Sequence, residues 1–384
     1  MPTEPQEFAA LRKLAGSRHA GRIDRQAQTL PDPVARLQYL RQATTAAGYT
    51  RARPRWIPAA ACLLLVALLA LRSDANVHRP AALRPPASPL RAGAFEVPNV
   101  WIVEQAQDYE TYSNGLRIET RLAVSNQPRS YPLLALDSRG ADGQLRSQPA
   151  GIVFHTTESR QAPFEAEKKH ELQRIGRELL LYVRGKRAYH YVIDRFGAVH
   201  RIVVESDAAN HAGSSVWADE RWRYLDLNAS FLGVAFEASM QTDQPPVTEA
   251  QVHAGRVLTE MLRSKYNLPA GNCVTHAQVS VNPDNMHIGW HADWGKDFPF
   301  REIGLPDNYQ EPLPSLYLYG FEFDPVYRAA TGPPLWNALA LAEDQVRRAA
   351  DRHQMPFADY RASLRKRYRE QSAALKQRNA DDEN

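Results

Sequence analysis

Two histidines lie in short apolar runs that are typical of buried strands. His155 closes the run GIVFH, and His276 lies in VTHAQV. Asp293 follows in a loop rich in aromatic residues. Two imidazoles and one carboxylate form a ligand set of catalytic zinc sites, in which the fourth position is left for water. By spacing alone, Asp284 and His287 would serve equally well as ligands, and all of these side chains could instead be ordinary hydrogen-bonded polar residues of the fold. The spacing therefore leaves open both the metal site and its third ligand.

Strands and helices must hold these residues, and the segment 149–310 alternates between the two patterns. The apolar run FLGVAFEA at 231–238 predicts a further buried strand. A helix is expected over roughly 164–183, and another begins at Thr248, where Gln251 stands three residues on in the spacing of a capping box. This interleaving predicts an α/β fold, with a mixed central β-sheet flanked by helices.

Four segments, in this order, resemble the type 2 N-acetylmuramoyl-L-alanine amidases and the related peptidoglycan recognition proteins. They are IVFHTTES, AYHYVIDRFGAVHRIV, NHAGSSVW, and THAQVS followed by GWHADWGKDFPF. The resemblance covers about residues 150–300. It implies Zn²⁺ held by His155, His276 and Asp293, which selects Asp293 among the alternatives. It also implies hydrolysis of the amide bond between N-acetylmuramic acid and L-alanine in peptidoglycan or muropeptides.

The resemblance further implies roles for residues around the metal. His291 stands two positions before the aspartate ligand, where such amidases place a group that faces the reacting carbonyl. Tyr189 matches a tyrosine near the zinc-bound water in related phage enzymes. His211 and Thr156 fall at positions that contact the substrate. We therefore expect His291 and Tyr189 to be catalytic, and His211 and Thr156 to bind substrate.

The chain departs from the family at one position. Many bacterial members carry a glutamate that handles the proton where this chain has Ala235. Glu237 lies two residues further along the same expected strand, so its side chain should point to the same face. We predict Glu237 as a catalytic replacement. The loss at Ala235 also leaves an alternative open, in which the domain binds peptidoglycan without cutting it.

The N-terminal part carries the run WIPAAACLLLVALLAL within 56–72, which as a helix would span roughly 24 Å. Arginines precede it, so the positive-inside rule predicts a cytoplasmic segment 1–55 and a single-pass anchor in a bacterial inner membrane. The proline- and alanine-rich segment 73–94 is typical of a tether. The catalytic domain would then lie in the periplasm. A cleaved signal peptide ending near Ala75 is the alternative.

The remaining parts are a small β-rich lead-in at 95–148 and a C-terminal extension at 311–384. Two charged helices, at about 335–353 and 357–376, are expected in the extension, and their polarity suggests an outer flank. The net charge of +4 calls for no nucleic-acid partner, while a mild basic excess suits a cell wall that carries carboxylates and phosphates. Nothing in the sequence identifies a protein partner.

Overall fold

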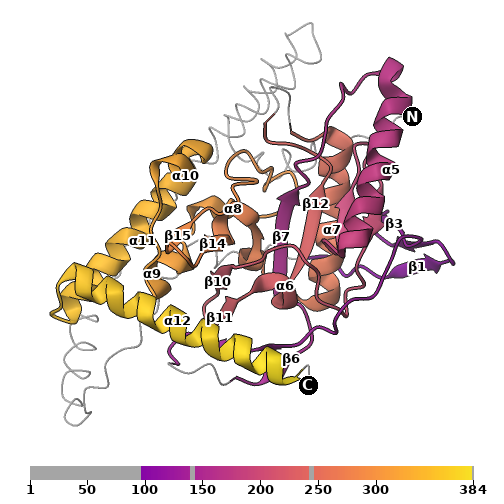
Figure 1. Cartoon of the computed structure of the whole chain (residues 1–384). Helices are drawn as coiled ribbons and strands as arrows, with labels where there is room; N and C mark the ends of the chain where they lie inside the picture. The colour runs from indigo at the N-terminus through magenta and orange to yellow at the C-terminus, as the bar shows by residue number, and fades with distance from the viewer. Residues whose placement is uncertain (1–96, 139–142, 242–245, 383–384) are drawn as a thin grey trace, which may run out of the picture. The chain divides into compact units, whose positions relative to one another are not determined.

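A computed structural model describes residues 97–138, 143–241 and 246–382 (Figure 1). The predicted cytoplasmic segment, membrane anchor and tether all lie outside these residues. Within the described ranges, no helix is long and apolar enough to cross a membrane.

An eight-stranded mixed sheet forms the centre of the fold, in the spatial order β1-β2-β3-β9-β8-β12-β7-β13. Strand β12 runs parallel to both β7 and β8, whereas β8 and β9 are antiparallel. Every residue of β7 and β12 is buried, as expected for apolar parallel strands covered on both faces. The mixed sheet predicted from the sequence is thus confirmed. The strands are, in chain order, β1 Ile102–Gln105, β2 Tyr109–Tyr112, β3 Arg117–Glu119, β7 Gly151–Thr156, β8 Tyr191–Ile193, β9 Val199–Arg201, β12 Phe231–Phe236 and β13 Cys273–Thr275.

Two long helices, α5 (Lys169–Lys186) and α7 (Glu249–Tyr266), cover opposite faces of this sheet (Figure 1). Leu180 and Val183 of α5 form one apolar cluster with Ala235 of β12. On α7, Gly255 lies against the ring of Phe236, the next residue of that strand. Successive residues of a strand point to opposite faces, so the two helices sandwich β12.

The start of α7 follows the sequence prediction. The Thr248 hydroxyl accepts a hydrogen bond from the Gln251 backbone N–H, and the Gln251 side chain accepts one from the Thr248 backbone N–H. This capping box satisfies two backbone donors that the first turn of a helix leaves without partners.

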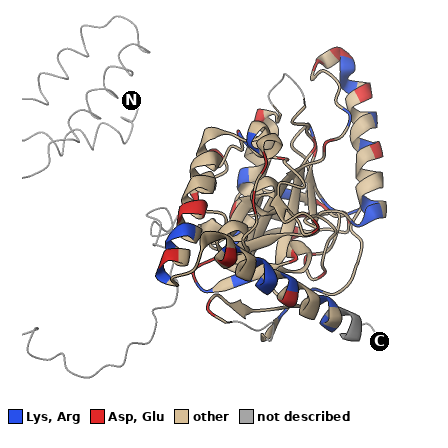
Figure 2. Ribbon diagram, turned by 60° about the vertical axis from the view of Figure 1, so that its left-hand side comes forward, with Lys and Arg blue, Asp and Glu red and all other residues tan. Residues whose placement is uncertain are grey.

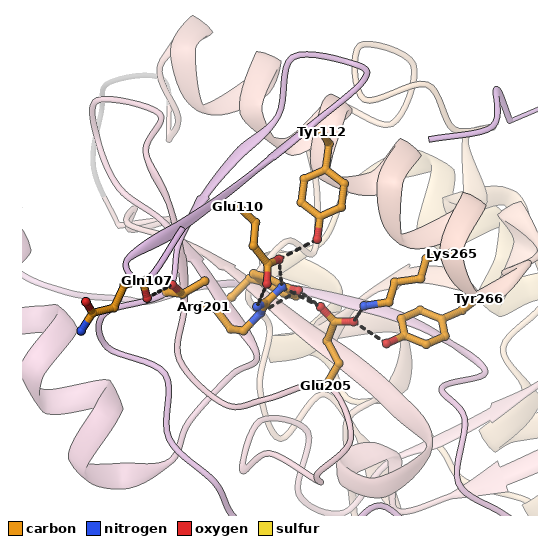
Figure 3. Close-up of polar contacts among 9 residues, drawn as sticks. Gln107, Glu110, Tyr112, Arg201, Glu205, Lys265 and Tyr266 are labelled. Carbon is orange, nitrogen blue, oxygen red and sulfur yellow. Dashed lines mark hydrogen bonds and ion pairs between the residues drawn. The ribbon is translucent and has the colours of Figure 1, made fainter. Parts of the chain in front are cut away.

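The segment predicted as a lead-in contributes β1, β2 and β3 to the central sheet, through parallel pairing of β3 with β9. A buried network of charges reinforces this junction (Figure 3). The Nη1 and Nη2 atoms of Arg201 donate to the Glu110 carboxylate at 2.9 and 2.8 Å, and Lys265 Nζ lies 2.7 Å from the Glu205 carboxylate. Burial raises the pKa of Glu205, but the charges of Lys265 and Arg201 outweigh it and bring that pKa to about 2. The network ties β2 and β9 to the end of α7.

The C-terminal extension packs on the core more closely than its polarity suggested. Figure 2 shows charged residues of both signs interspersed along its helices. Their inner sides are apolar: Leu335 and Leu339 join the main core, and the ring of Tyr368 packs on Phe321 at 4.8 Å. The helices are α9 Pro314–Tyr319, α10 Pro325–Ala330, α11 Pro333–Arg352 and α12 Phe357–Asp382.

Short elements complete the described part of the chain. They are β4 Tyr131–Pro132, β5 Leu134–Ala135, β6 Leu145–Arg146, η1 Ala166–Lys168, β10 Val216–Ala218, β11 Trp222–Leu225, α6 Leu227–Ser230, η2 Ala270–Asn272, α8 His276–Val279, β14 Val281–Asn282, β15 His287–Ile288 and η3 Asn308–Gln310.

Candidate metal centre

The carboxyl ends of β7 and β13 bring the first two candidate ligands together. The two strands are parallel, with Phe154 opposite Thr275, so the next residues, His155 and His276, become neighbours. The prediction that His276 lies within a strand is wrong. Strand β13 ends at Thr275, because a capping box between Thr275 and Gln278 starts the short helix α8 at His276.

Asp293 meets both histidines from the loop that follows β15. Its Oδ1 atom lies 2.8 Å from Nδ1 of His276, and its Oδ2 atom lies 3.3 Å from Nδ1 of His155. The ligand atoms of the three residues all lie within 4.8 Å of one another. The other candidates, Asp284 and His287, are not part of this group. A tetrahedral zinc ion with bonds of about 2.0–2.2 Å holds its ligand atoms about 3.3–3.6 Å apart. The His155–Asp293 separation of 3.3 Å lies in this range, and the His276–Asp293 separation of 2.8 Å is shorter.

A chain of hydrogen bonds fixes which nitrogen of His155 can bind a cation. Nε2 of His211 lies 3.3 Å from the carbonyl oxygen of Phe231, which can only accept, so Nε2 carries the proton. Nδ1 of His211 must then accept the hydrogen bond from Nε2 of His155, 3.1 Å away. In the neutral ring of His155 the remaining nitrogen, Nδ1, keeps its lone pair and directs it at the Asp293 carboxylate.

The protonation states of His155 and Asp293 also suit a metal. Burial, with the charge of His276, lowers the pKa of His155 to about 4, so its imidazole is neutral near pH 7. Burial raises the pKa of Asp293, but His276, whose Nδ1 lies 2.8 Å from Oδ1, outweighs it and holds that pKa below its usual range. A lone pair and a carboxylate 3.3 Å apart repel each other unless a cation lies between them. Neutral imidazole and ionised carboxylate are the metal-binding forms of these side chains.

His211 lies behind His155 rather than in an open groove. It is 9% exposed, both of its ring nitrogens contact protein atoms, and it packs against Gly233, where an added Cβ would come within 2.6 Å of the ring. This placement differs from the predicted substrate contact, because no ring nitrogen remains for a substrate. It matches a residue that orients a metal ligand from behind.

Replacing His211 by Phe distinguishes these two roles. The substitution keeps the ring but removes the acceptor for the His155 Nε2–H, so we expect zinc affinity to fall about tenfold, as is typical when such an outer partner is lost. Equilibrium competition with a fluorescent zinc chelator measures this affinity. Unchanged zinc binding combined with a raised KM would instead favour the predicted substrate role.

His291 and Tyr189, predicted as catalytic, both lie beside the metal group. The ring of His291 stacks on that of His276 with centroids 4.8 Å apart, and its backbone N–H donates to the Ser280 hydroxyl. Burial and the charge of His276 lower the pKa of His291, although the residue is exposed to solvent. The ring of Tyr189 lies 5.1 Å from that of His155, and burial raises the pKa of its hydroxyl. The structure therefore brings both residues to the site.

Thr156, the other predicted substrate contact, is buried at the end of β7. Its hydroxyl donates to the Glu158 carboxylate at 2.6 Å. Adjacent strand residues point to opposite faces, so its side chain leaves the sheet on the side away from His155. This position gives no support to a substrate contact.

Glu237 shares the face of the sheet with Ala235, as predicted, but it lies under helix α5. Its Oε2 atom accepts a hydrogen bond from the Arg195 backbone N–H at 3.1 Å, and Gly176 of α5 lies directly above it. Glu237 lines a cavity of about 390 Å³ together with residues of α5, Asp194 and His200, and no residue of the metal group lines it. Burial raises the pKa of Glu237 to about 7.

Ala235 itself lies directly beside His155, because the two residues are partners in the parallel register of β12 and β7. A glutamate at this position would therefore stand next to the first ligand. Among the described residues, the only carboxylate in the metal group is that of Asp293.

Two residues that support the Asp293 loop were not predicted from the sequence. Ser280 accepts the backbone N–H of His291, and the Tyr309 hydroxyl donates to the carbonyl oxygen of Trp294, next to Asp293, at 2.6 Å. Trp294 is fully buried. A serine and a tyrosine outside any catalytic pattern carry no local signal of such a role.

Comparison with known proteins gives a family match over part of this chain. The family model described as N-acetylmuramoyl-L-alanine amidase matches residues 145–296, which contain all three candidate ligands. This match confirms, over these residues, the resemblance to the superfamily of type 2 amidases and peptidoglycan recognition proteins. At the level of the family it supports a peptidoglycan amidase. No curated protein matches the chain.

Solved structures similar to this chain include amidases and a recognition protein. The amidase AmiD from E. coli, in complex with the substrate anhydro-N-acetylmuramic acid-L-Ala-D-gamma-Glu-L-Lys, is 19% identical, with 62% of this chain and 89% of that chain covered and a TM-score of 0.34. The amidase LysC from Clostridium intestinale URNW is 22% identical, with coverage of 47% and 93% and a TM-score of 0.26. The Drosophila peptidoglycan recognition protein SD is 17% identical, with coverage of 41% and 84% and a TM-score of 0.26.

Proposed function

We propose that the chain is a zinc-dependent amidase that hydrolyses the bond between N-acetylmuramic acid and L-alanine in peptidoglycan or its fragments. One observation carries the zinc part of this proposal. The hydrogen bonds of His211 leave His155 with a nitrogen lone pair aimed at the Asp293 carboxylate, 3.3 Å away. A cation held by His155, His276 and Asp293 relieves that repulsion, and the family match supports the reaction class.

Residues of the chain have two different roles around the proposed ion. His155, His276 and Asp293 hold it, and His211 orients His155. When bound, zinc lowers the pKa of a bound water to about 7 and polarises the carbonyl under attack.

His291 and Tyr189 would form hydrogen bonds with the groups of the substrate that react. The exposed ring of His291, stacked on His276, can donate an N–H to the carbonyl oxygen as negative charge develops there. It is also placed to take up the proton that the attacking water releases and to pass it to the leaving amine. The hydroxyl of Tyr189, whose ring lies 5.1 Å from that of His155, would add a second hydrogen bond.

A second candidate function is a module that binds peptidoglycan without cutting it. The specific observation in its favour is Ala235, which leaves no carboxylate beside His155 where many relatives place one. Filled positions for all three ligands favour the enzyme, because a site that only binds the wall has no need of a complete zinc set.

The site of action follows from the N-terminal segment. With residues 56–72 as a single-pass anchor and 73–94 as a tether, the catalytic domain would lie in the periplasm of a bacterium, within reach of the wall. This part of the proposal rests on the apolar run and the arginines that precede it.

Digestion of purified sacculi by the full chain tests the proposal. We expect zinc-loaded protein to release intact stem peptides with a free L-alanine amino group, detectable by mass spectrometry. Removal of the metal with a chelator should stop the release, and added Zn²⁺ should restore it. Protein that binds sacculi and retains zinc, but releases no stem peptide, would establish the binding module instead.

A further inference from the structure

Helix α10 of the C-terminal extension lies against the two segments that carry the candidate ligands His276 and Asp293. Residue Ala277, next to His276, contacts this helix, and so do Gly289 and Gly295 on either side of Asp293. All residues of α10 lie outside the segment 145–296 that matches the amidase family. The contact is therefore a feature of this chain that the family match does not cover.

Tyr327 makes the contact with the first of these segments. It is 3% exposed, and its hydroxyl donates to the carbonyl oxygen of Ala277 at 2.7 Å. Asp324 fixes the start of α10 by accepting the Tyr327 backbone N–H at 2.7 Å. Because α8 is only four residues long, its carbonyl groups depend on partners outside the helix.

The ring of Tyr327 makes the contact with the second segment. A Cβ added to Gly289 would lie 2.0 Å from Cδ2 of Tyr327, so the glycine lets the ring lie directly on the backbone. Gly289 has φ +78°, which a glycine adopts without strain. Past Asp293, the backbone N–H of Gly332 donates to the carbonyl oxygen of Gly295 at 3.2 Å, and an added Cβ on Gly295 would lie 2.9 Å from Thr331.

We propose that Tyr327 is a positioning residue of the metal centre, which holds the His276 helix and the Asp293 loop at the separation that binds zinc. The inference rests on the proposed zinc site. In this inference the C-terminal extension supports the metal centre of the domain that matches the amidase family. His276 and Asp293 are also joined directly, since the Ala277 backbone N–H donates to the Asp293 carbonyl oxygen at 3.2 Å. Tyr327 therefore bonds the carbonyl group of the same residue, Ala277, whose backbone N–H joins the two ligand segments.

The test compares two buried tyrosines in the full chain. Tyr327→Phe removes the hydroxyl at the metal centre. Tyr319→Phe is the matched control, because Tyr319 is fully buried in α9 and its hydroxyl donates to Gln371 at 2.9 Å, where neither partner belongs to the metal centre. Zinc dissociation constants are measured by competition with a fluorescent chelator, and hydrogen exchange is measured on the metal-free proteins.

We expect Tyr327→Phe to raise the zinc dissociation constant about tenfold and the control to change it less than twofold. In the metal-free proteins, amides of residues 276–280 and 289–295 should exchange faster in Tyr327→Phe than in Tyr319→Phe. Equal zinc affinities in the two variants would overturn the inference. A parent chain that binds zinc without releasing stem peptides would contradict the proposed amidase activity and leave this inference standing, whereas a parent that binds no zinc overturns both.

Discussion

Replacing Asp293 by Asn should lower the affinity for zinc about a hundred- to a thousandfold, since a structural zinc site binds with about 10–16 kcal/mol shared among four ligands. The amide keeps the size of the side chain but removes the charge that faces both histidines. Release of stem peptides from sacculi should be lost in parallel. Metal content after dialysis and mass spectrometry of the digest measure the two effects.

Asp284→Asn is the matched control for this experiment. Asp284 is the carboxylate that spacing alone would have allowed as a ligand, and it is exposed and lies outside the metal group. We expect Asp284→Asn to have the same zinc content and the same cleavage rate as the parent. If Asp284→Asn lost zinc while Asp293→Asn kept it, the assignment of the third ligand would be wrong.

Replacing Glu237 by Gln should stabilise the protein at pH 8 by up to about 3 kcal/mol and leave it unchanged at pH 4. Burial raises the pKa of Glu237 from 4.5 to about 7 in the folded state. Between these two values the unfolded chain has lost the proton that the folded chain retains, so the stability of the parent falls as pH rises from 4.5 to 7. The amide carries no proton to lose, and its oxygen can still accept the Arg195 N–H.

Urea unfolding of the metal-free proteins between pH 4 and pH 8 measures this difference. Glu178→Gln is the control, because Glu178 is an exposed carboxylate on the same helix α5 that covers Glu237. The Glu237→Gln variant also tests whether Glu237 has the predicted catalytic role. If Glu237→Gln cleaves muropeptides at the parent's rate, Glu237 is not the replacement for the glutamate missing at Ala235.

The sequence predicted the elements whose signals are local. The capping box at Thr248 and Gln251 depends on two side chains three residues apart, and the structure confirms it. The same kind of signal was present at Thr275 and Gln278, but the apolar run VTHAQV resembled a strand throughout. His276 was therefore placed in a strand, although it begins a helix.

The features that the sequence could not predict depend on contacts between distant residues. Strand β3 pairs with β9, and this pairing makes the predicted lead-in at 95–148 part of the central sheet. The position of α5 placed Glu237 beneath Gly176, and no pattern in β12 indicates which residue of that face a helix covers. The role of His211 became visible only with the Phe231 carbonyl and the His155 ring as its two neighbours.

The support that α10 gives to the ligand loop has a consequence for the order of events during synthesis. The ribosome completes His155, His276 and Asp293 before residues 325–330, which form helix α10. A nascent chain thus carries all three ligands before their support exists. If α10 positions the proposed zinc site, binding of the metal in its final geometry waits until this C-terminal part of the chain has been made and packed.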